Sequence, residues 1–357
     1  MLILILIFAF IVLWIIIGKL YINILKKTPY YKGESPFFNG LTFNRLNKRH
    51  TIPKINFLTL VKYLIFKKNP IFKYQKWQNP NFKIPVVIPE TKNDEGIKCY
   101  FINHSTVLLQ VDGLNIITDP VYAKIAGLFY IGPKRVHPPG IAFDNLPPID
   151  IILLSHNHYD HMDIKALIKL QKRDNSLIVT PLGNDYILKR KYKKSKIVTL
   201  DWGEHFHYNT NTTIYLEKAY HWSRRSVYDQ NKALWGGFVI ATNNYKIYYS
   251  GDTALVDGKI FQEIGNKHQG FDLALLPIGA YLPYEFMQYV HTSPEDAATI
   301  HKLTNAKKSI GIHWGTFQLS GETYYQPKED LEIAKNKLGI PTTDFITLAP
   351  SEYIKIN

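Results

Sequence analysis

The chain has 357 residues, and 46% of them are hydrophobic, which excludes global disorder and allows a substantial core. Its single cysteine, Cys99, excludes a disulfide framework and a thiolate-rich zinc site, so any metal must be held by histidine and carboxylate side chains. Most of the net charge of +14 lies in one segment near the N-terminus, which favours contact with an anionic partner.

The chain opens with a strongly apolar run. Its first seventeen residues, MLILILIFAFIVLWIII, contain no charged or strongly polar side chain. A membrane span needs about 20 apolar residues, a length reached here if Lys19 extends its charge to the interface. A cleaved signal peptide usually opens with positive charge and ends in an A-x-A-like site, and neither is obvious in this sequence. The run therefore predicts an uncleaved membrane anchor helix over residues 1–25.

Residues 26–97 form a basic lead-in segment, rich in Pro, Asn, Lys and aromatic side chains, with one helix expected at 55–68. Residues 19–83 hold fourteen Lys or Arg and a single acid, Glu34. Because this charge adjoins the apolar run, it favours an anionic membrane surface over nucleic acid. The positive-inside rule would then place the catalytic body on the cytoplasmic side. A simply solvated, lysine- and asparagine-rich surface is the alternative.

A regular pattern begins at residue 98. Residues 98–122 alternate like two strands joined at Asp112-Gly113, a hairpin signal, and residues 149–154 form a continuous apolar strand typical of a sheet buried on both faces. Further strands are expected at 176–181, 195–202, 212–221, 235–242, 244–253, 271–280 and 307–316, and helices at 163–173, 258–266, 294–304 and 328–337. This order predicts a catalytic domain over 98–350 in which two sheets pack between helices.

Residues 155–161 read SHNHYDH and directly follow the apolar strand. His156 and His158 are two positions apart and project to the same side of an extended strand end. A turn at Tyr159 would bring Asp160 and His161 towards a second position. Imidazole and carboxylate ligands suit zinc, and also iron or manganese. The motif thus predicts ligands for two adjacent metals, against the alternative of a polar loop that happens to contain histidines.

Three more metal-type side chains stand where a predicted strand ends, namely His221, Asp252 and His313. Gly251 would let the backbone turn closely before Asp252. A lone His221 or His313 would more often be a satisfied core histidine. Their recurrence at strand ends, together with the SHNHYDH motif, favours one shared metal site.

In order, these residues resemble the seven ligands of metallo-β-lactamase-fold hydrolases. More narrowly, the chain resembles the N-acyl-phosphatidylethanolamine-hydrolysing phospholipases D over about residues 98–330. The stretches that carry this resemblance are IGPKR at 131–135, LPPIDIILLSHNHYDHMD at 146–163, NKALWGGF at 231–238, FDLALLPIGAY at 271–281, HTSPEDA at 291–297 and IHWGTF at 312–317. The resemblance implies an α/β fold, the αββα sandwich, with two Zn²⁺ per chain. His156, His158 and His221 would hold one ion, Asp160, His161 and His313 the other, with Asp252 bridging.

The resemblance implies a zinc-dependent phosphodiesterase that hydrolyses (N-acyl-)phosphatidylethanolamine to phosphatidic acid and (N-acyl)ethanolamine. Paired cations clamp phosphodiester oxygens and lower the pKa of a bound water to roughly 7. Asp160 would help orient the nucleophile, and His291 would donate a proton or hydrogen bond to the leaving oxygen, unless it is only a loop histidine. Tyr159 is expected on the substrate side, and His104 is expected to support the ligands without binding metal.

One position departs from the phospholipase D pattern, since Val290 stands where that family has Gln and an amide contact would be lost. The main alternative is a metallohydrolase like the L-ascorbate-6-phosphate lactonases, acting on a small phosphorylated lactone or ester, because the same ligands would serve it. A nucleic-acid-binding protein or nuclease is a third possibility, but no arginine-rich groove motif supports it. The expected partners are a phospholipid substrate and an anionic membrane surface, without nucleic acid, and a homodimer is left open.

Overall fold

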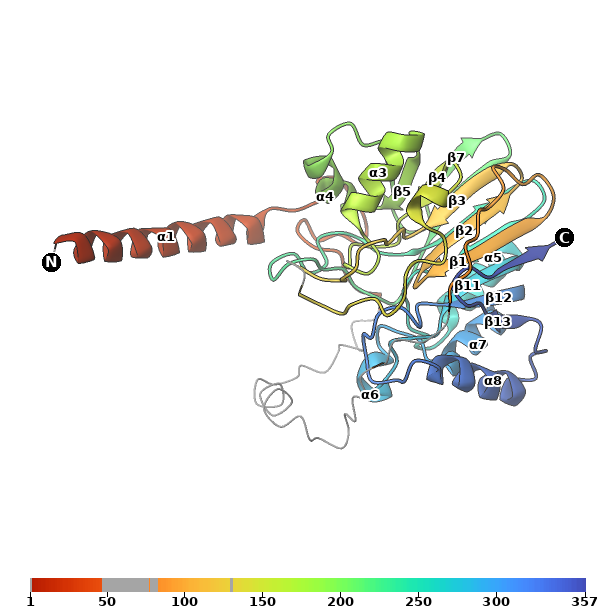
Figure 1. The fold of residues 1–357 in the computed structure, drawn as a ribbon. Coiled ribbons are helices and arrows are strands. Elements are labelled where there is room, and N and C mark those ends of the chain that lie inside the picture. The colour runs from red at the N-terminus through yellow and green to blue at the C-terminus, as the bar shows by residue number, and fades with distance from the viewer. Residues whose placement is uncertain (1, 47–76, 78–82, 129–130) are drawn as a thin grey trace.

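The computed structural model describes residues 2–46, 77, 83–128 and 131–357. Within them, two seven-stranded sheets lie face to face between two layers of helices (Figure 1). The predicted αββα sandwich is therefore confirmed. The helix expected at 55–68 lies outside the described residues, as do residues 47–76 and 78–82 of the basic lead-in segment.

The first sheet combines the beginning of the domain with the last strand of the chain. Its order is β14-β1-β2-β3-β4-β5-β6. The bounds are β1 Ile97–Asn103, β2 Thr106–Val111, β3 Leu114–Thr118, β4 Ile151–Leu153, β5 Leu177–Pro181, β6 Ile197–Leu200 and β14 Tyr353–Ile356. The hairpin between β2 and β3 turns at Asp112 and Gly113 with φ of 45° and 74°, the left-handed pair that an Asp-Gly turn favours.

The second sheet has the order β13-β12-β11-β10-β9-β8-β7. Its strands are β7 His205–Asn209, β8 Thr212–Glu217, β9 Gly237–Ala241, β10 Lys246–Tyr249, β11 Phe271–Pro277, β12 Ala306–Ile312 and β13 Phe345–Thr347. Each sheet is antiparallel at one end, from β14 to β3 and from β7 to β10, and parallel across the rest. The two sheets thus follow the same plan.

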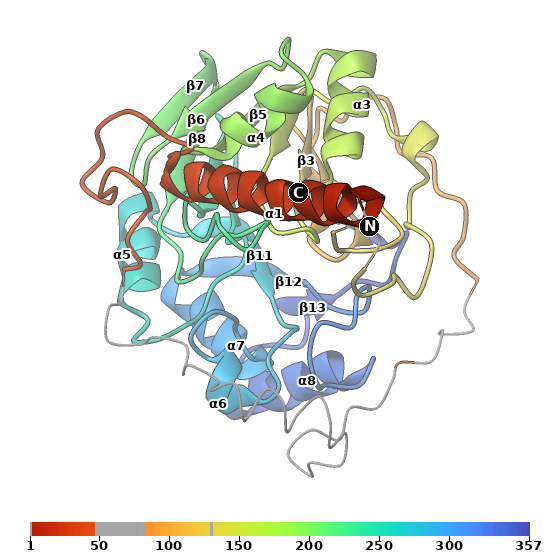
Figure 2. The same cartoon turned by 90° about the vertical axis from the view of Figure 1, so that its left-hand side faces the viewer.

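Helices cover the outer faces of both sheets. They are α3 Ile164–Asp174, α4 Asn184–Lys191, α5 Lys259–His268, α6 Tyr284–Met287, α7 Pro294–Leu303 and α8 Gln326–Leu338, with a short 3-10 turn at Phe143–Asn145. In Figure 2, α3 and α4 lie in the upper half of the molecule, and α7 and α8 lie in the lower half. The expected helices at 163–173, 258–266, 294–304 and 328–337 are confirmed as α3, α5, α7 and α8.

Polar N-caps define where helices α3 and α7 begin. The Asp163 carboxylate accepts hydrogen bonds from the backbone N–H groups of Lys165 and Ala166 and so caps α3. At α7, Ser293 Oγ accepts from the backbone of Asp296 while the Asp296 carboxylate accepts from the backbone of Ser293, which forms a capping box. These caps place the segments that come just before each helix.

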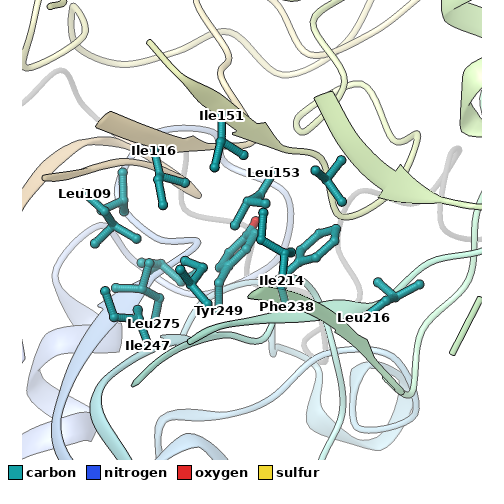
Figure 3. Close-up of a cluster of buried hydrophobic side chains, with 14 of the residues drawn as sticks. Leu109, Ile116, Ile151, Leu153, Ile214, Leu216, Phe238, Ile247, Tyr249 and Leu275 are labelled. Carbon is teal, nitrogen blue, oxygen red and sulfur yellow. The ribbon is translucent and has the colours of Figure 1, made fainter. Parts of the chain in front are cut away.

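The main core lies between the two sheets. Leu109, Ile116 and Leu153 of the first sheet face Ile247 and Leu275 of the second, and all five are fully buried (Figure 3). Apolar burial of this kind provides about 25 cal/mol for each Å² removed from water and is the dominant stabilising term. Because the inner faces interdigitate, the two sheets are held in a fixed relation, and so are the loops at their ends.

The N-terminal region corrects one expectation. Residues Leu2–Lys27 form a helix, α1, that projects from the body (Figure 1). Across the described residues, however, no helix meets the length and apolarity that crossing a bilayer demands. The uncharged run that suggested the anchor stops at Lys19, short of a full span. The predicted single-pass membrane anchor is therefore wrong, and the cytoplasmic orientation derived from it loses its basis.

Candidate metal centre

The seven side chains expected to bind metal lie together at one end of the sandwich. The loop after β4 carries His156, His158, Asp160 and His161, and the segments after β8, β10 and β12 carry His221, Asp252 and His313. In the second sheet β8, β10 and β12 all run in the same direction. Their carboxyl ends therefore meet at one edge, the place where sheets of this type commonly bind ligands.

Oδ2 of Asp252 is the point on which the imidazoles converge. It lies 3.2 Å from His161 Nε2 and 3.1 Å from His313 Nε2. On the other side it lies 3.9 Å from His156 Nε2 and 3.7 Å from His221 Nε2. The Asp252 side chain is only 1% exposed. This carboxylate is therefore within reach of two separate sets of histidines.

The candidate ligands form two main groups whose ligand atoms lie within 4.8 Å of one another. One contains His156, His158 and His221, and the other contains His104, Asp160, His161 and His313. Two overlapping groups join Asp119 to His156 and His161, and Asp252 to His221 and His291. Each main group offers at least the three protein ligands that a catalytic zinc site uses.

Several of these buried atoms have no hydrogen-bond partner among the described residues. They are Nε2 of His158 and of His161, both ring nitrogens of His313, and both carboxylate oxygens of Asp252. Leaving polar atoms unpaired in an interior is costly, so a cluster of them requires an explanation. Nitrogen and oxygen donors that converge without a partner fit a bound cation.

The electrostatics of the pocket also favour positive charge. Burial alone would raise the pKa of Asp160 and Asp252, but the neighbouring histidines, His161 first, hold both pKa values well below the ordinary range. Burial would likewise lower the pKa of His313, yet Asp252 and Asp160 raise it to about 9. The two carboxylates thus favour the protonated, positively charged form of His313. A metal cation bound at the same place would provide positive charge instead of that proton.

In the group of His156, His158 and His221, burial outweighs the nearby carboxylates and lowers the pKa of each ring. Burial, reinforced by adjacent imidazoles, lowers the pKa of His156 well below its ordinary value. Burial also lowers the pKa of His221, and it lowers the pKa of His158 to about 4. These three rings are therefore neutral near pH 7. Neutral imidazole is the form that binds zinc.

Asp119 is a buried residue of this site that the sequence reasoning missed. One carboxylate oxygen accepts from Ser155 N at 2.7 Å, and the other accepts from Tyr249 Oη at 2.5 Å. The second oxygen also lies 2.6 Å from His161 Nδ1. Asp119 follows the end of β3, so the strand-end signal that identified Asp252 would have found it too.

His104 lies behind the second group. Its Nε2 is 3.2 Å from Asp160 Oδ2, and its ring centroid is 4.0 Å from that of His313. Burial, with help from His313, lowers its pKa to about 3, so the ring is neutral. The contact with Asp160 suits the expected supporting role. A ring nitrogen of His104 is also close enough to Asp160, His161 and His313 to be a metal ligand itself.

Tyr159 is half-buried at the edge of the loop. Its hydroxyl donates to the backbone carbonyl of Arg225 at 3.1 Å, and the Arg225 guanidinium lies 3.9 Å from the centroid of its ring. Tyr159 also packs against a small buried cluster made of Val121, Ala126 and Phe317. Its expected contact with substrate stays a prediction, whereas its contact with Arg225, a residue the sequence reasoning did not single out, is part of the structure.

His291 lies at the rim of the site. Its side chain is 13% exposed, and Nδ1 lies 3.8 Å from Asp252 Oδ2 without a hydrogen-bond partner in the described chain. Burial lowers its pKa to about 4. The preceding residue, Val290, offers its carbonyl to His221 Nδ1 at 2.7 Å. The backbone at 290 thus orients a candidate ligand even though the side chain is apolar.

Backbone geometry brings the two sheets close together at this end. Gly251 has φ of +58°, and a Cβ there would lie 2.8 Å from the Ser155 side chain and 2.8 Å from the Gly236 carbonyl. Only glycine fits this position, as the sequence led us to expect. His313 also has a positive φ, 61°, a strained value for a residue with a side chain and one often found at functional sites.

Comparison with known proteins agrees with this geometry. The family model described as the Beta-lactamase superfamily domain matches residues 114–314, more than half of the chain. The chain belongs to the metallo-β-lactamase superfamily. It is accordingly a metal-dependent hydrolase of that superfamily, with histidine and aspartate clusters able to bind metal. The expected fold family is confirmed.

Two relatives of this chain are named for one and the same activity. N-acyl-phosphatidylethanolamine-hydrolyzing phospholipase D 1 of Caenorhabditis elegans is 35% identical over 271 residues, covering 73% of this chain and 76% of the relative. The mitochondrial N-acyl-phosphatidylethanolamine-hydrolyzing phospholipase D of Saccharomyces cerevisiae is 35% identical over 263 residues, 70% of this chain and 54% of the relative. The resemblance seen in the sequence is therefore confirmed.

A solved structure supports the architecture. A metallo hydrolase from Ignicoccus hospitalis superposes with a TM-score of 0.54 over 74% of this chain and 99% of its own length. Only 20% of the aligned residues are identical, so this similarity supports the fold alone. The αββα arrangement recurs where sequence similarity is low.

Proposed function

We propose that this protein is a zinc-dependent phosphodiesterase that hydrolyses N-acyl-phosphatidylethanolamine to phosphatidic acid and N-acylethanolamine. The observation that carries the proposal is the position of Asp252 Oδ2 between two groups of histidines, in a chain 35% identical to a relative named for this reaction. Two adjacent cations suit phosphodiester chemistry, because they can contact the attacking and leaving oxygens at once.

In this proposal, His156, His158 and His221 would hold one zinc ion, and Asp160, His161 and His313 would hold a second. Asp252 would be a ligand within reach of both. When bound, the metals would supply Lewis acidity and an activated water-derived nucleophile at neutral pH. Their number and identity belong to the proposal, and iron or manganese would suit the same ligands.

The side chains of this protein would then orient the reacting groups. Asp160, held at Oδ2 by His104, would accept a hydrogen bond from the nucleophile and fix its direction. His291 would present a ring N–H to the leaving oxygen of the ethanolamine group, since its Nδ1 has no other hydrogen-bond partner among the described residues. His221 is turned towards the site by the Val290 carbonyl.

The test uses the full chain, purified with its metal content measured. It is incubated with N-acyl-phosphatidylethanolamine and, separately, with phosphatidylethanolamine, phosphatidylcholine and a phosphorylated lactone, and the products are identified by mass. Phosphatidic acid and N-acylethanolamine, lost on chelation and restored by zinc, would support the proposal. Opening of the lactone without cleavage of any lipid would overturn it in favour of a lactonase-like enzyme.

The acyl preference has its own test at position 290. The side chain of Val290 cannot make the amide contact made by the Gln of the phospholipase D pattern, although its backbone carbonyl still orients His221. We therefore expect wild-type protein to discriminate weakly between acylated and unacylated phosphatidylethanolamine. Val290→Gln should raise the ratio of their kcat/KM values. An unchanged ratio would show that position 290 does not contact the acyl amide.

A further inference from the structure

The loop that carries four of the candidate ligands has few anchors of its own. Between His156 and Met162, the backbone closes a turn in which Met162 N donates to His158 O at 2.8 Å. Asn157 is fully buried, yet neither its amide oxygen nor its amide nitrogen has a hydrogen-bond partner among the described residues. What holds the backbone of this loop must therefore come from elsewhere in the chain.

Arg225 reaches this loop from the segment that follows His221. Its Nη1 donates to the carbonyl of Asn157 at 3.0 Å and to that of Met162 at 2.9 Å. The guanidinium carbon of Arg225 also lies 3.9 Å from the centroid of the Tyr159 ring, and the Tyr159 hydroxyl donates a hydrogen bond to the Arg225 carbonyl. One side chain thus contacts both ends and the middle of the loop.

Arg225 is fixed in turn by Asp229. Oδ1 of Asp229 accepts from the backbone N–H of Arg225 at 3.0 Å and from that of Ser226 at 2.7 Å. Oδ2 accepts from Tyr30 Oη at 3.0 Å. Asp229 is 2% exposed, so these hydrogen bonds are shielded from water and closely define the backbone at Arg225.

The N-terminal segment contacts Asp229 through Tyr30 and is itself held at the end of α1. Lys232 Nζ donates to the carbonyls of Leu25, Lys26 and Thr28 at 2.6, 2.8 and 2.8 Å, and so caps the end of α1. The Tyr30 ring stacks on Tyr186 with centroids 4.4 Å apart. Residues far apart in the sequence therefore connect the end of α1 to the ligand loop through Asp229 and Arg225.

We propose that Arg225 is a positioning residue that fixes the backbone of residues 156–162 for metal binding, and that Asp229 and Tyr30 fix Arg225. Arginine suits the task because its planar guanidinium can donate to carbonyls while stacking on an aromatic ring. Groups that hold metal ligands from behind commonly change metal affinity by about 10- to 100-fold when removed. This inference rests on the proposed metal site.

The experiment measures binding of Co²⁺ to metal-free full-length protein, by competition with a chelating dye and by the visible spectrum of the bound ion. Arg225→Met keeps the aliphatic stem and removes the donors, and we expect its Co²⁺ affinity to fall about 10- to 100-fold with an altered spectrum. Arg225→Lys should recover part of the affinity. Arg224→Met is the matched control, because Arg224 is exposed and donates to Ser226 O, with no hydrogen bond to residues 156–162 among the described residues.

A second pair of variants tests the N-terminal connection. Tyr30→Phe removes the hydrogen bond to the Asp229 carboxylate and should weaken Co²⁺ binding about two- to tenfold, less than the loss of Arg225 because Tyr30 acts on the loop only through Asp229 and Arg225. Tyr31→Phe is its control, since Tyr31 Oη donates to Glu34 O and has no hydrogen bond to Asp229. Hydrogen exchange of the metal-free protein should be faster at residues 157–162 in Arg225→Met than in wild type.

The outcomes separate this inference from the metal site itself. Wild-type protein that binds no Co²⁺ would overturn both. Wild-type protein that binds Co²⁺, with Arg225→Met matching it in affinity, spectrum and exchange, would overturn the positioning role alone. If Arg225→Met does not fold, the comparison of Tyr30→Phe with Tyr31→Phe decides, and equal Co²⁺ affinities would overturn the proposal.

Discussion

Asp119 Oδ2 lies 2.6 Å from His161 Nδ1, and this contact leaves the opposite ring nitrogen, Nε2, pointing at Asp252. A carboxylate behind a metal-ligating histidine fixes the ring and its tautomer and makes the free nitrogen more basic. Asp119 thereby couples the end of β3 to the ligand loop after β4. Both residues are fully buried, so the contact is screened little by solvent.

Asp119→Asn should therefore weaken metal binding while preserving the shape of the site. We expect about a 10- to 100-fold loss of affinity, measured by chelator competition. Asp119→Ala should in addition lower stability by about 1–3 kcal/mol, since it leaves the backbone N–H of Ser155 and the Tyr249 hydroxyl without their acceptor. Affinity unchanged in Asp119→Asn would contradict the role of this carboxylate.

His156 and His291 should give different phenotypes, although both lie in the same pocket. His156→Ala should lose metal and activity together, because it removes a ligand. His291→Ala should keep its metal and lose about 10²- to 10⁴-fold in kcat, the usual range for a positioned side chain that donates a proton or hydrogen bond to the leaving oxygen. Metal analysis and steady-state kinetics on the same preparations separate the two, and metal loss in His291→Ala would make His291 a ligand.

Stability can be tested in the core between the sheets, away from the ligands. Ile247, on β10, is fully buried among side chains of both sheets. Ile247→Ala should lower the free energy of unfolding by about 2–5 kcal/mol, because it removes buried methyl groups and leaves a cavity. Ile333 on α8 is 65% exposed, and Ile333→Ala is the control, with little expected change in the urea midpoint.

Glu217 predicts a pH dependence of stability that is independent of the metal site. Burial alone would raise its pKa, but hydrogen bonds from His268 and Lys267 hold the pKa below its ordinary value of 4.5. A lowered folded-state pKa adds stability that is complete above the ordinary pKa and is lost as the pH falls through the folded-state value. Glu217→Gln should remove this contribution.

Urea titrations of wild type and Glu217→Gln, both free of metal, check this prediction between pH 7 and pH 3.5. The stability difference between them should be constant above about pH 5 and should shrink as the pH falls below 4.5. A difference that grows on acidification would mean that the Glu217 pKa is raised rather than lowered.

Much of the fold could be predicted from sequence because its signals are local. Continuous apolar runs identified the buried strands, and the Asp112-Gly113 turn identified the first hairpin. The seven candidate ligands were found because each follows a strand. β14 and α4 were missed, since β14 is short and half-exposed and the side chains of α4 are mostly polar. Their positions depend on partners distant in the chain.

The parts of the site that sequence could not supply are the contacts between segments. Arg225 is one basic residue among many, and nothing in the neighbouring sequence predicts that it donates to the carbonyls of Asn157 and Met162. The anchor prediction failed for a different reason, because the uncharged run at the N-terminus ends at Lys19 and no helix of the described residues meets the length and apolarity of a membrane span.

The shared plan of the two sheets has a consequence for how the protein assembles. The group of His156 and His158 is completed by His221, and the group of Asp160 and His161 is completed by His313, so each takes members from both sheets. Neither half of the domain contains all the members of either main group. A bound cation would act as a cross-link between layers that are otherwise joined by apolar packing, and it would stabilise the assembled sandwich by about 2.7 kcal/mol at a hundred times its Kd.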